Sequence, residues 1–154
     1  MKKPSRGKYQ YTVEADRVIY VIHAPGLEDF FVWHCLKDRW KACYKSHLLG
    51  KHSPTADFIK QCKRQSITPC FHILEEVHLT QVMAYRHVIA WTEILYRKGF
   101  EPLVGIKTLF YMTEMNEYTQ SVFDRNKKAD LTVLLSCEAC LVNKFLCSQC
   151  QSIR

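Results

Sequence analysis

The C-terminal end of the chain carries two cysteine pairs whose spacing suits a metal ion. Two residues separate the cysteines of each pair, and six residues separate the pairs. A turn of this length lets two thiolates approach one ion, and two such turns supply the four sulfurs of a closed structural zinc site. Because the spacer is shorter than that of a zinc ribbon, buried free thiols and a redox or intermolecular role are the alternatives. The candidate zinc ligands are Cys137, Cys140, Cys147 and Cys150.

Basic residues concentrated in the first half of the chain form a second candidate site. Between residues 37 and 64, eight lysines and arginines face only Asp38 and Asp57. Residues 1–105 carry 16 basic and 10 acidic side chains, whereas residues 106–154 carry 6 and 5. Such a charge excess favours a polyanion whose phosphates it would neutralise, and the alternative is an ordinary solvated surface. The candidate phosphate contacts are Lys37, Arg39, Lys41, Lys45, Lys51, Lys60, Lys63 and Arg64.

Further cysteines and histidines are scattered through the same region. Their spacings match no standard zinc pattern, and cysteine is among the residues most often buried in a core. Burial is therefore the favoured interpretation, with a metal set among them as the alternative. These residues are His34, Cys35, Cys43, His47, His52, Cys62, Cys70 and His72.

Length and composition limit the class of protein. The 154 residues, 47% of them hydrophobic and 24% charged, with a net charge of +7, fit one domain of ordinary size or a smaller domain with an appendage. No apolar run reaches the length of a membrane span, and the basic start has no apolar segment behind it to make a signal peptide. Eight cysteines in such a chain favour thiols or metal ligands over disulfides. We therefore expect a soluble, intracellular protein, cytoplasmic or nuclear.

The apolar pattern predicts the elements that must position these side chains. Two β-rich runs around Pro25-Gly26 predict a hairpin, and Ser53-Pro54 predicts the N-cap and first residue of a helix. A long periodic segment ends at Gly99. Its predicted inward stripe comprises Val82, Tyr85, Val88, Ile89, Thr92, Leu95 and Tyr96. The predicted elements are strands over 17–24 and 28–33, helices over 36–49 and 55–64, a strand over 70–77, a helix over 81–98, a strand over 103–112, a helix over 113–125 and a strand over 130–136.

These elements predict an α/β (α+β) fold with a small, mainly antiparallel central sheet flanked by helices. A C-terminal strand-helix-strand extension would pack on that domain. The predicted organisation is a flexible basic arm over 1–12, a domain over 13–105, the extension over 106–136 and a cysteine-rich tail over 137–154.

Five short motifs follow one another through the middle of the chain. They are His47–Pro54 with Phe58-Ile59-Lys60, Thr68-Pro69, Ile73–Val77, Trp91, and Lys98-Gly99-Phe100 with Pro102-Leu103. In this order and at these separations they resemble the GIY-YIG nuclease domain, and the resemblance spans about residues 17–105. It implies a scaffold that holds nucleic acid and, in active members, cleaves a phosphodiester with the help of a divalent cation.

The resemblance also implies which residues would stand at the catalytic positions. Such domains use a tyrosine in each of the first two strands, an arginine at the start of the first helix and a histidine downstream. Here the first strand reads Val18-Ile19-Tyr20, and Arg39 and His47 match the next two positions. The catalytic candidates are therefore Tyr20, Arg39 and His47, as remnants of a site.

Other positions of this chain depart from the family pattern. The second strand reads Phe31-Val32-Trp33, which lacks the phenolic hydroxyl. The cation-binding glutamate should lie three residues before Trp91, where the chain has Val88. Valine cannot bind a cation, so the resemblance implies that the metal site of the nuclease is lost.

Three functions follow from these features. The first is a nuclease-dead module that binds nucleic acid, with DNA favoured, through its basic helical surface. The second is an active, divergent endonuclease that uses magnesium and a substitute carboxylate such as Glu93 or Glu76. The third is a protein-interaction adaptor whose docking surface comprises Trp33 and the cysteine tail.

Overall fold

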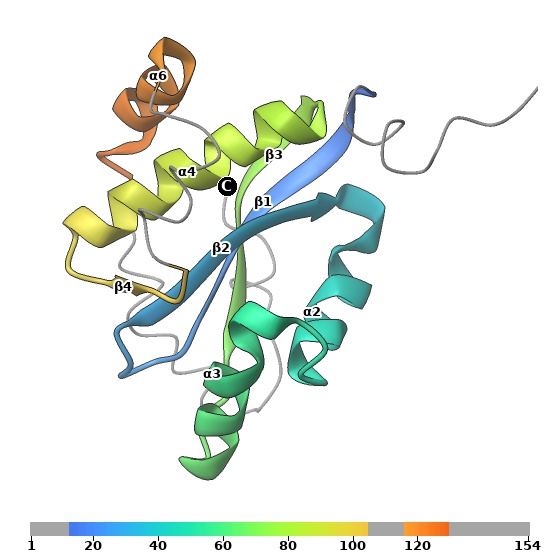
Figure 1. Ribbon diagram of the computed structural model, residues 1–154, viewed down its shortest axis with the longest axis vertical. Coiled ribbons are helices and arrows are strands. Elements are labelled where there is room, and N and C mark those ends of the chain that lie inside the picture. Colours follow the sequence, from blue (N-terminus) through green and yellow to red (C-terminus); the bar gives the residue numbers. More distant parts are fainter. Residues whose placement is uncertain (1–12, 105–115, 130–154) are drawn as a thin grey trace, which may run out of the picture.

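The computed structural model describes residues 13–104 and 116–129 of the chain. Within these ranges the fold is α+β, with a four-stranded mixed sheet between helices (Figure 1). The basic arm, the cysteine tail, the strand predicted over 130–136 and all but two residues of that predicted over 103–112 lie outside the described residues. The elements are β1 (Ala15–His23), β2 (Asp29–Leu36), the 3-10 helix η1 (Lys37–Arg39), α2 (Trp40–Leu48), α3 (Ser53–Arg64), β3 (Cys70–Leu79), α4 (Gln81–Arg97), β4 (Glu101–Pro102) and α6 (Glu117–Asn126).

The sheet has β1 in its interior and the strand order β3-β1-β2-β4. β1 pairs antiparallel with both β2 and β3, whereas the two-residue strand β4 runs parallel to β2. The prediction of a mainly antiparallel sheet flanked by helices is therefore confirmed at the level of fold class. None of the helices in the described ranges combines the length and apolar character that a membrane span requires.

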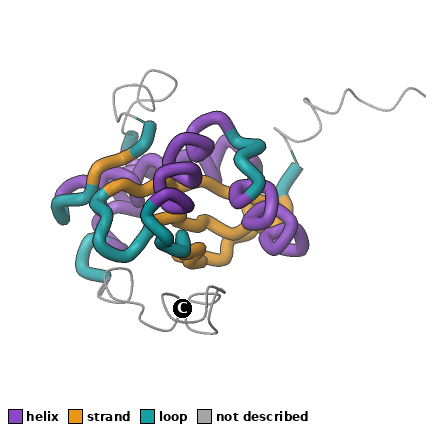
Figure 2. Tube along the Cα trace, turned by 90° about the horizontal axis from the view of Figure 1, so that it is seen from below, coloured by secondary structure: helices purple, strands orange, loops and turns teal. Residues whose placement is uncertain are grey.

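Different helices cover the two faces of the sheet. α4 and α6 pack on one face and α2 and α3 on the other (Figure 1), so the strands lie between helical layers (Figure 2). Side chains alternate between faces along a strand, and β1 divides the core in this way. Ile19 and Val21 join the α4–α6 cluster, whereas Val18, Tyr20 and Ile22 join the cluster on the α2–α3 face.

A β-bulge interrupts the alternation of β3. Ile19 of β1 pairs with Glu75, but the next residue, Tyr20, pairs with Ile73. One extra residue in a strand changes which of its side chains point to a given face. Consequently Glu75 on one side of the bulge and His72, which pairs with Val21, on the other both lie on the face of the sheet that α4 and α6 cover.

The helix ends agree with the glycine signals, but the start of α3 differs by one residue. Gly50 and Gly99 follow α2 and α4 with φ values of 72° and 100°, in the left-handed region that glycine reaches without strain. Ser53 is the first residue of α3, and His52 takes the N-cap position without a side-chain cap bond. The predicted N-cap at Ser53 is therefore wrong by one residue: Ser53 is already helical, and Pro54 is tolerated in the first turn because its missing N–H would have no intrahelical partner.

The inward stripe predicted for the long helix is confirmed at its centre and wrong at its ends. Val82 and Tyr96 are 43% and 48% exposed. The middle of α4 is buried nearly all round, because it lies between the sheet and α6. Its buried residues are Ala84, His87, Val88, Ile89, Ala90, Trp91, Thr92, Ile94 and Leu95.

Candidate functional site

Tyr20 lies at the centre of a buried polar chain on the α2–α3 face. It stands in β1 and is fully buried. Its hydroxyl oxygen lies 2.8 Å from Nε2 of His47 and 3.4 Å from Sγ of Cys43, both on α2. Burial, reinforced by Cys43, raises the pKa of Tyr20 well above its usual value. The phenol therefore stays neutral and can donate a hydrogen bond.

From His47 the chain of hydrogen bonds continues into the first turn of α3. Nδ1 of His47 lies 2.8 Å from Oγ1 of Thr55, whose hydroxyl donates to the carbonyl of His52 at 3.4 Å. The positive φ of Gly50 lets the backbone reverse between α2 and α3, which returns Thr55 to the side of His47. The rings of His47 and His52 also stack, with centroids 3.9 Å apart.

One arrangement of protons satisfies every donor in this chain. The Cys43 thiol donates to the Tyr20 oxygen, the Tyr20 hydroxyl to Nε2 of His47, and Nδ1–H of His47 to Thr55. Loss of the thiol proton permits the opposite polarity, in which Thr55 donates to His47, His47 to Tyr20, and Tyr20 to the Cys43 thiolate. This row of hydrogen bonds can thus release one proton without leaving a buried nitrogen or oxygen unpaired. Such a network is suited to acid–base chemistry.

A second thiol, Cys35 of β2, interacts with Cys43. This interaction, together with those of His47 and Tyr20, outweighs burial and lowers the pKa of Cys43, whereas the same interaction and burial raise the pKa of Cys35. The site therefore contains a thiol pair, and the thiolate is the nucleophilic and metal-binding form of cysteine.

Arg39 lies outside this chain. It ends η1, and its side chain is exposed. Among the described hydrogen bonds none joins it to Tyr20 or His47. The structure thus brings together two of the three predicted catalytic residues and leaves the third at the surface.

The second-strand aromatic residues contribute packing to this site. Trp33 lies opposite Tyr20 in the register of β1 and β2, and the ring of Phe31 lies 5.7 Å from that of His47. Trp33 also packs against Phe31 and against Tyr85 of α4. Neither residue supplies a hydroxyl to the hydrogen-bonded chain.

Among the described residues, no carboxylate hydrogen bonds to Tyr20, Cys43, His47 or Thr55. Val88, at the position where the family resemblance implies a glutamate, is fully buried in the α4–α6 cluster. Of the two substitute carboxylates, Glu93 pairs with Arg97 at 2.8 Å and Glu76 pairs with Lys37 at 3.3 Å. A magnesium ion requires oxygen ligands, and the part of this site that the structure describes does not assemble them.

The basic residues of 37–64 lie in η1, α2, α3 and the loop between the two helices. All eight side chains are exposed, as are Asp38 and Asp57. Lys37 is bonded to Glu76 across to β3. The predicted phosphate contacts Lys37, Arg39, Lys41, Lys45, Lys51, Lys60, Lys63 and Arg64 therefore all reach solvent on the helical layer that covers Tyr20.

Two groups of side chains in the described ranges have the donor atoms for a metal ion. The ligand atoms of each group lie within 4.8 Å of one another. One group comprises Cys43, His47 and His52, and the other comprises His23, Cys70 and His72. In the first group, both ring nitrogens of His47 are already hydrogen bonded to Tyr20 and Thr55. The predicted zinc ligands Cys137, Cys140, Cys147 and Cys150 lie outside the described residues.

Sequence reasoning missed Cys43 and Thr55 as partners of the Tyr20–His47 pair. Cys43 and His47 are four residues apart on one helix and therefore share a face, a spacing that could have revealed them. Thr55 meets them only because the backbone reverses at Gly50. The glycine predicts a turn at this point, but it does not predict which side chains the turn brings into contact.

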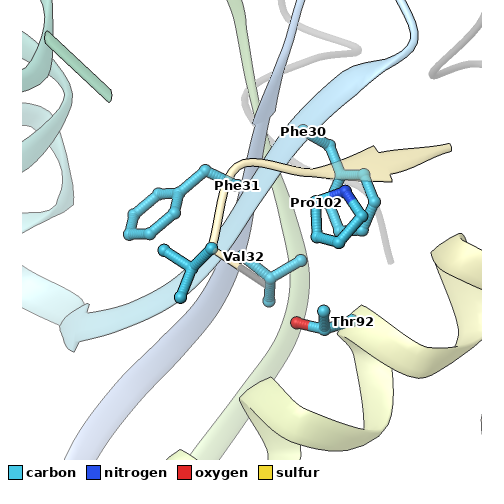
Figure 3. Close-up of a pocket in the computed structure, with 6 residues that line it drawn as sticks. Phe30, Phe31, Val32, Thr92 and Pro102 are labelled. Carbon is cyan, nitrogen blue, oxygen red and sulfur yellow. The ribbon is translucent and has the colours of Figure 1, made fainter. Parts of the chain in front are cut away.

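A small hollow between β2, β4 and α4 is apolar. Figure 3 shows Phe30, Val32 and Pro102 at its wall with Thr92 of α4. The Thr92 hydroxyl donates to the carbonyl of Val88 at 2.8 Å, so it is not directed at a ligand. The chemistry of the α2–α3 face thus has no counterpart in this hollow.

No protein-family model matches the chain, and no match is found among curated proteins or among solved structures.

Proposed function

We propose that this chain is a non-catalytic nucleic-acid-binding module on a GIY-YIG-like scaffold. It contacts phosphates through the basic layer of η1, α2 and α3, which we define as the eight basic residues between 37 and 64. One observation carries the proposal: all eight cations are exposed on one helical layer, with only two aspartates among them. Affinity from such contacts arises from neutralised phosphates and released counterions, and it carries no sequence preference.

The positive charge is uneven between the two sides of the sheet, which supports a directed contact over general solubility. Across the sheet, α4 and α6 with the lysines that directly follow them carry six basic and three acidic residues. The net charge of that side is therefore +3, half of the +6 that residues 37–64 carry. A polyanion is therefore attracted to the α2–α3 side, since the field of clustered charges steers association.

The site under the basic layer supports binding without cleavage. Tyr20 and His47 are buried and bonded to each other, Arg39 points into solvent, and the carboxylates Glu76 and Glu93 have basic partners of their own. Metal-assisted hydrolysis of a phosphodiester needs ligands that hold the cation beside the reacting oxygen. The described residues supply an acid–base network but no set of carboxylate oxygens that would hold magnesium beside it.

The test compares two double charge reversals in the full chain. Lys60→Glu/Lys63→Glu changes the basic layer, and Lys127→Glu/Lys128→Glu makes the same change in charge after α6. Fluorescence anisotropy with a labelled DNA duplex and an RNA hairpin, from about 50 to about 200 mM salt, measures affinity and its salt dependence. We expect the first pair to weaken binding at least tenfold and to reduce the salt slope by roughly 2, since each phosphate contact contributes about 0.9. The second pair should change affinity less than twofold.

Two outcomes would overturn this proposal. One is an absence of affinity for either nucleic acid at low salt; the other is an equal loss from both pairs of substitutions. Plasmid cleavage with magnesium or manganese that disappears in Arg39→Ala would instead support the endonuclease. The same Lys60→Glu/Lys63→Glu protein must retain its circular dichroism spectrum for the comparison to count.

A further inference from the structure

Three metal-binding side chains meet on the face of the sheet opposite Tyr20. His23 is the last residue of β1 and lies directly across from Cys70, the first residue of β3. His72 follows two residues later on β3 and so points to the same face as Cys70. One ligand atom from each residue lies within 4.8 Å of the others. The three donors are thus brought together by strand register, across a gap in sequence of almost fifty residues that no short motif spans.

The imidazoles of this group are buried without hydrogen-bond partners. His23 is 2% exposed and His72 is 0% exposed. Nε2 of His23 and both ring nitrogens of His72 are buried and have no partner. Buried polar atoms are nearly always hydrogen bonded, and an orphaned one commonly marks a bound ion or water. Three such atoms in two stacked rings, whose centroids lie 4.7 Å apart, are an unusual concentration.

The chemistry of these donors suits a metal ion. Imidazole nitrogen and thiolate sulfur are the ligands that Zn²⁺ most often has in proteins, and each of the two imidazoles has an unpartnered ring nitrogen that can take this role. Metal ligation requires neutral histidine and deprotonated cysteine.

We infer that His23, Cys70 and His72 form a transition-metal site, and that two imidazoles with one thiolate suit Zn²⁺ best. Tetrahedral zinc with bonds of about 2.0 to 2.3 Å holds its ligand atoms about 3.3 to 3.8 Å apart. The three donors reach that spacing by closing about 1.5 Å at most, which small side-chain rotations supply. A water would complete the tetrahedron.

The Cys43–His47–His52 group differs from the His23 group in the hydrogen bonding of its imidazoles. In the Cys43 group, His47 uses Nε2 for Tyr20 and Nδ1 for Thr55, so a metal would have to displace existing bonds. In the His23 group a metal replaces nothing at the imidazole nitrogens and satisfies atoms that otherwise have no partner. Because the three residues are buried, the ion enters as the chain folds, and it joins the end of β1 to the start of β3.

The experiment first removes the other candidate ligands. In the full chain, Cys137, Cys140, Cys147 and Cys150 are changed to serine together with Cys43. This background protein is expressed with added zinc, and its metal content is measured by mass spectrometry. We expect about one zinc per chain. After replacement by Co²⁺, we expect a thiolate-to-metal charge-transfer band and the d–d bands of a tetrahedral ion.

Cys70→Ala in this background is then compared with Cys62→Ala. Both cysteines are fully buried, so the two substitutions remove the same volume from the core. Cys70→Ala should lower the zinc content at least tenfold and abolish the charge-transfer band, whereas Cys62→Ala should leave both unchanged. Excess EDTA should lower the melting temperature of the Cys62→Ala protein but not that of the Cys70→Ala protein.

The site is overturned if the folded background protein contains less than a tenth of a zinc per chain, or if both alanine variants bind zinc equally. If Cys70→Ala does not fold, His23→Ala at the end of β1 provides the same comparison. If the background itself does not fold, the variants are made in the unaltered chain. The expected difference is then the loss of one equivalent of metal relative to Cys62→Ala.

Discussion

The α2–α3 face and the α4–α6 face both bury histidines against the same sheet, but they satisfy them differently. On the first face, both ring nitrogens of His47 are hydrogen bonded within a continuous chain. On the second, His87 is bonded at both nitrogens, whereas His34 at Nδ1, His23 at Nε2 and His72 at both have none. One face therefore holds a complete proton network, and the other holds lone pairs available to a ligand.

Charge is also distributed differently between the two faces. On the α4–α6 face, Glu75 accepts from Trp91 and from His87, and His87 in turn bonds to Tyr118 of α6 at 2.7 Å. Although burial alone raises the pKa of Glu75, these hydrogen bonds outweigh it and lower that pKa. Glu75 of β3 therefore bonds directly to α4 and is linked to α6 through His87. The basic layer of η1, α2 and α3 lies on the opposite face, which holds no such buried carboxylate among the described residues.

The largest expected effect tests whether the α4–α6 face can accept the missing carboxylate. Val88→Glu places a glutamate where the family resemblance implies one, but Val88 is fully buried in an apolar cluster. An unpaired buried charge should lower the free energy of unfolding by about 3 to 5 kcal/mol. Urea denaturation measures this loss, with Val82→Glu, at an exposed position of the same helix, as the nearly silent control. A stable Val88→Glu protein that cleaves DNA would contradict this account.

The next effect is a dependence of stability on pH that arises from the α4–α6 face. Burial, with Arg17 adding to it, lowers the pKa of His34 from 6.5 to about 4. Below pH 6.5, His34 binds a proton in the unfolded chain but not in the folded protein. The free energy of unfolding therefore falls as the pH drops from 6.5 towards 4. The loss amounts to about 3 kcal/mol. Urea denaturation at several pH values should show a shallower acid loss in His34→Phe than in the parent.

An exposed histidine of the same sheet provides the control for this pH dependence. His78 is largely exposed and bonded to Asp16. His78→Asn should leave the steep loss of stability between pH 6.5 and 4 in place. If His34→Phe loses stability as steeply as the parent, His34 is not the group responsible.

An intermediate effect tests whether the polar chain of the α2–α3 face is satisfied as a unit. Tyr20→Phe removes one hydroxyl and leaves Nε2 of His47 without its hydrogen bond and the Cys43 thiol without its acceptor, which should cost about 2 kcal/mol. The control is Tyr44→Phe, which removes a half-buried hydroxyl bonded to the carbonyl of Pro69 and should cost about 1 kcal/mol or less. If urea denaturation gives the same loss in the free energy of unfolding for both variants, the hydrogen-bonded row around Tyr20 stabilises the protein no more than a single hydrogen bond does.

The smallest effect on stability concerns the exposed edge of the basic layer. Arg39→Ala should change the free energy of unfolding by no more than about 0.5 kcal/mol, because its side chain is exposed and outside the polar chain. It should nevertheless reduce the salt slope of DNA binding by about 1, as expected for one phosphate contact. A large loss of stability would place Arg39 in the buried site after all.

The elements on both faces could be predicted from the sequence because their signals are local. The hairpin around Gly26, the helix ends at Gly50 and Gly99 and the strand over 70–77 depend on turn residues and on the alternation or periodicity of nearby side chains. The inward stripe of α4 was wrong at Val82 and Tyr96, because periodicity does not show where a helix leaves the sheet. The site was predicted in part: Tyr20 and His47 meet, whereas Arg39 does not join them.

The sequence by itself determined the order of the elements and the concentration of basic charge between residues 37 and 64, because each is a property of residue type and local spacing. The tertiary structure alone decided which side chains meet. Tyr20 reaches His47 across 27 residues of chain, and the bulge in β3 puts both Glu75 and His72 on the same face of the sheet. Such contacts depend on strand register and on a single chain reversal, and a shift of one residue in a strand moves every side chain to the other face.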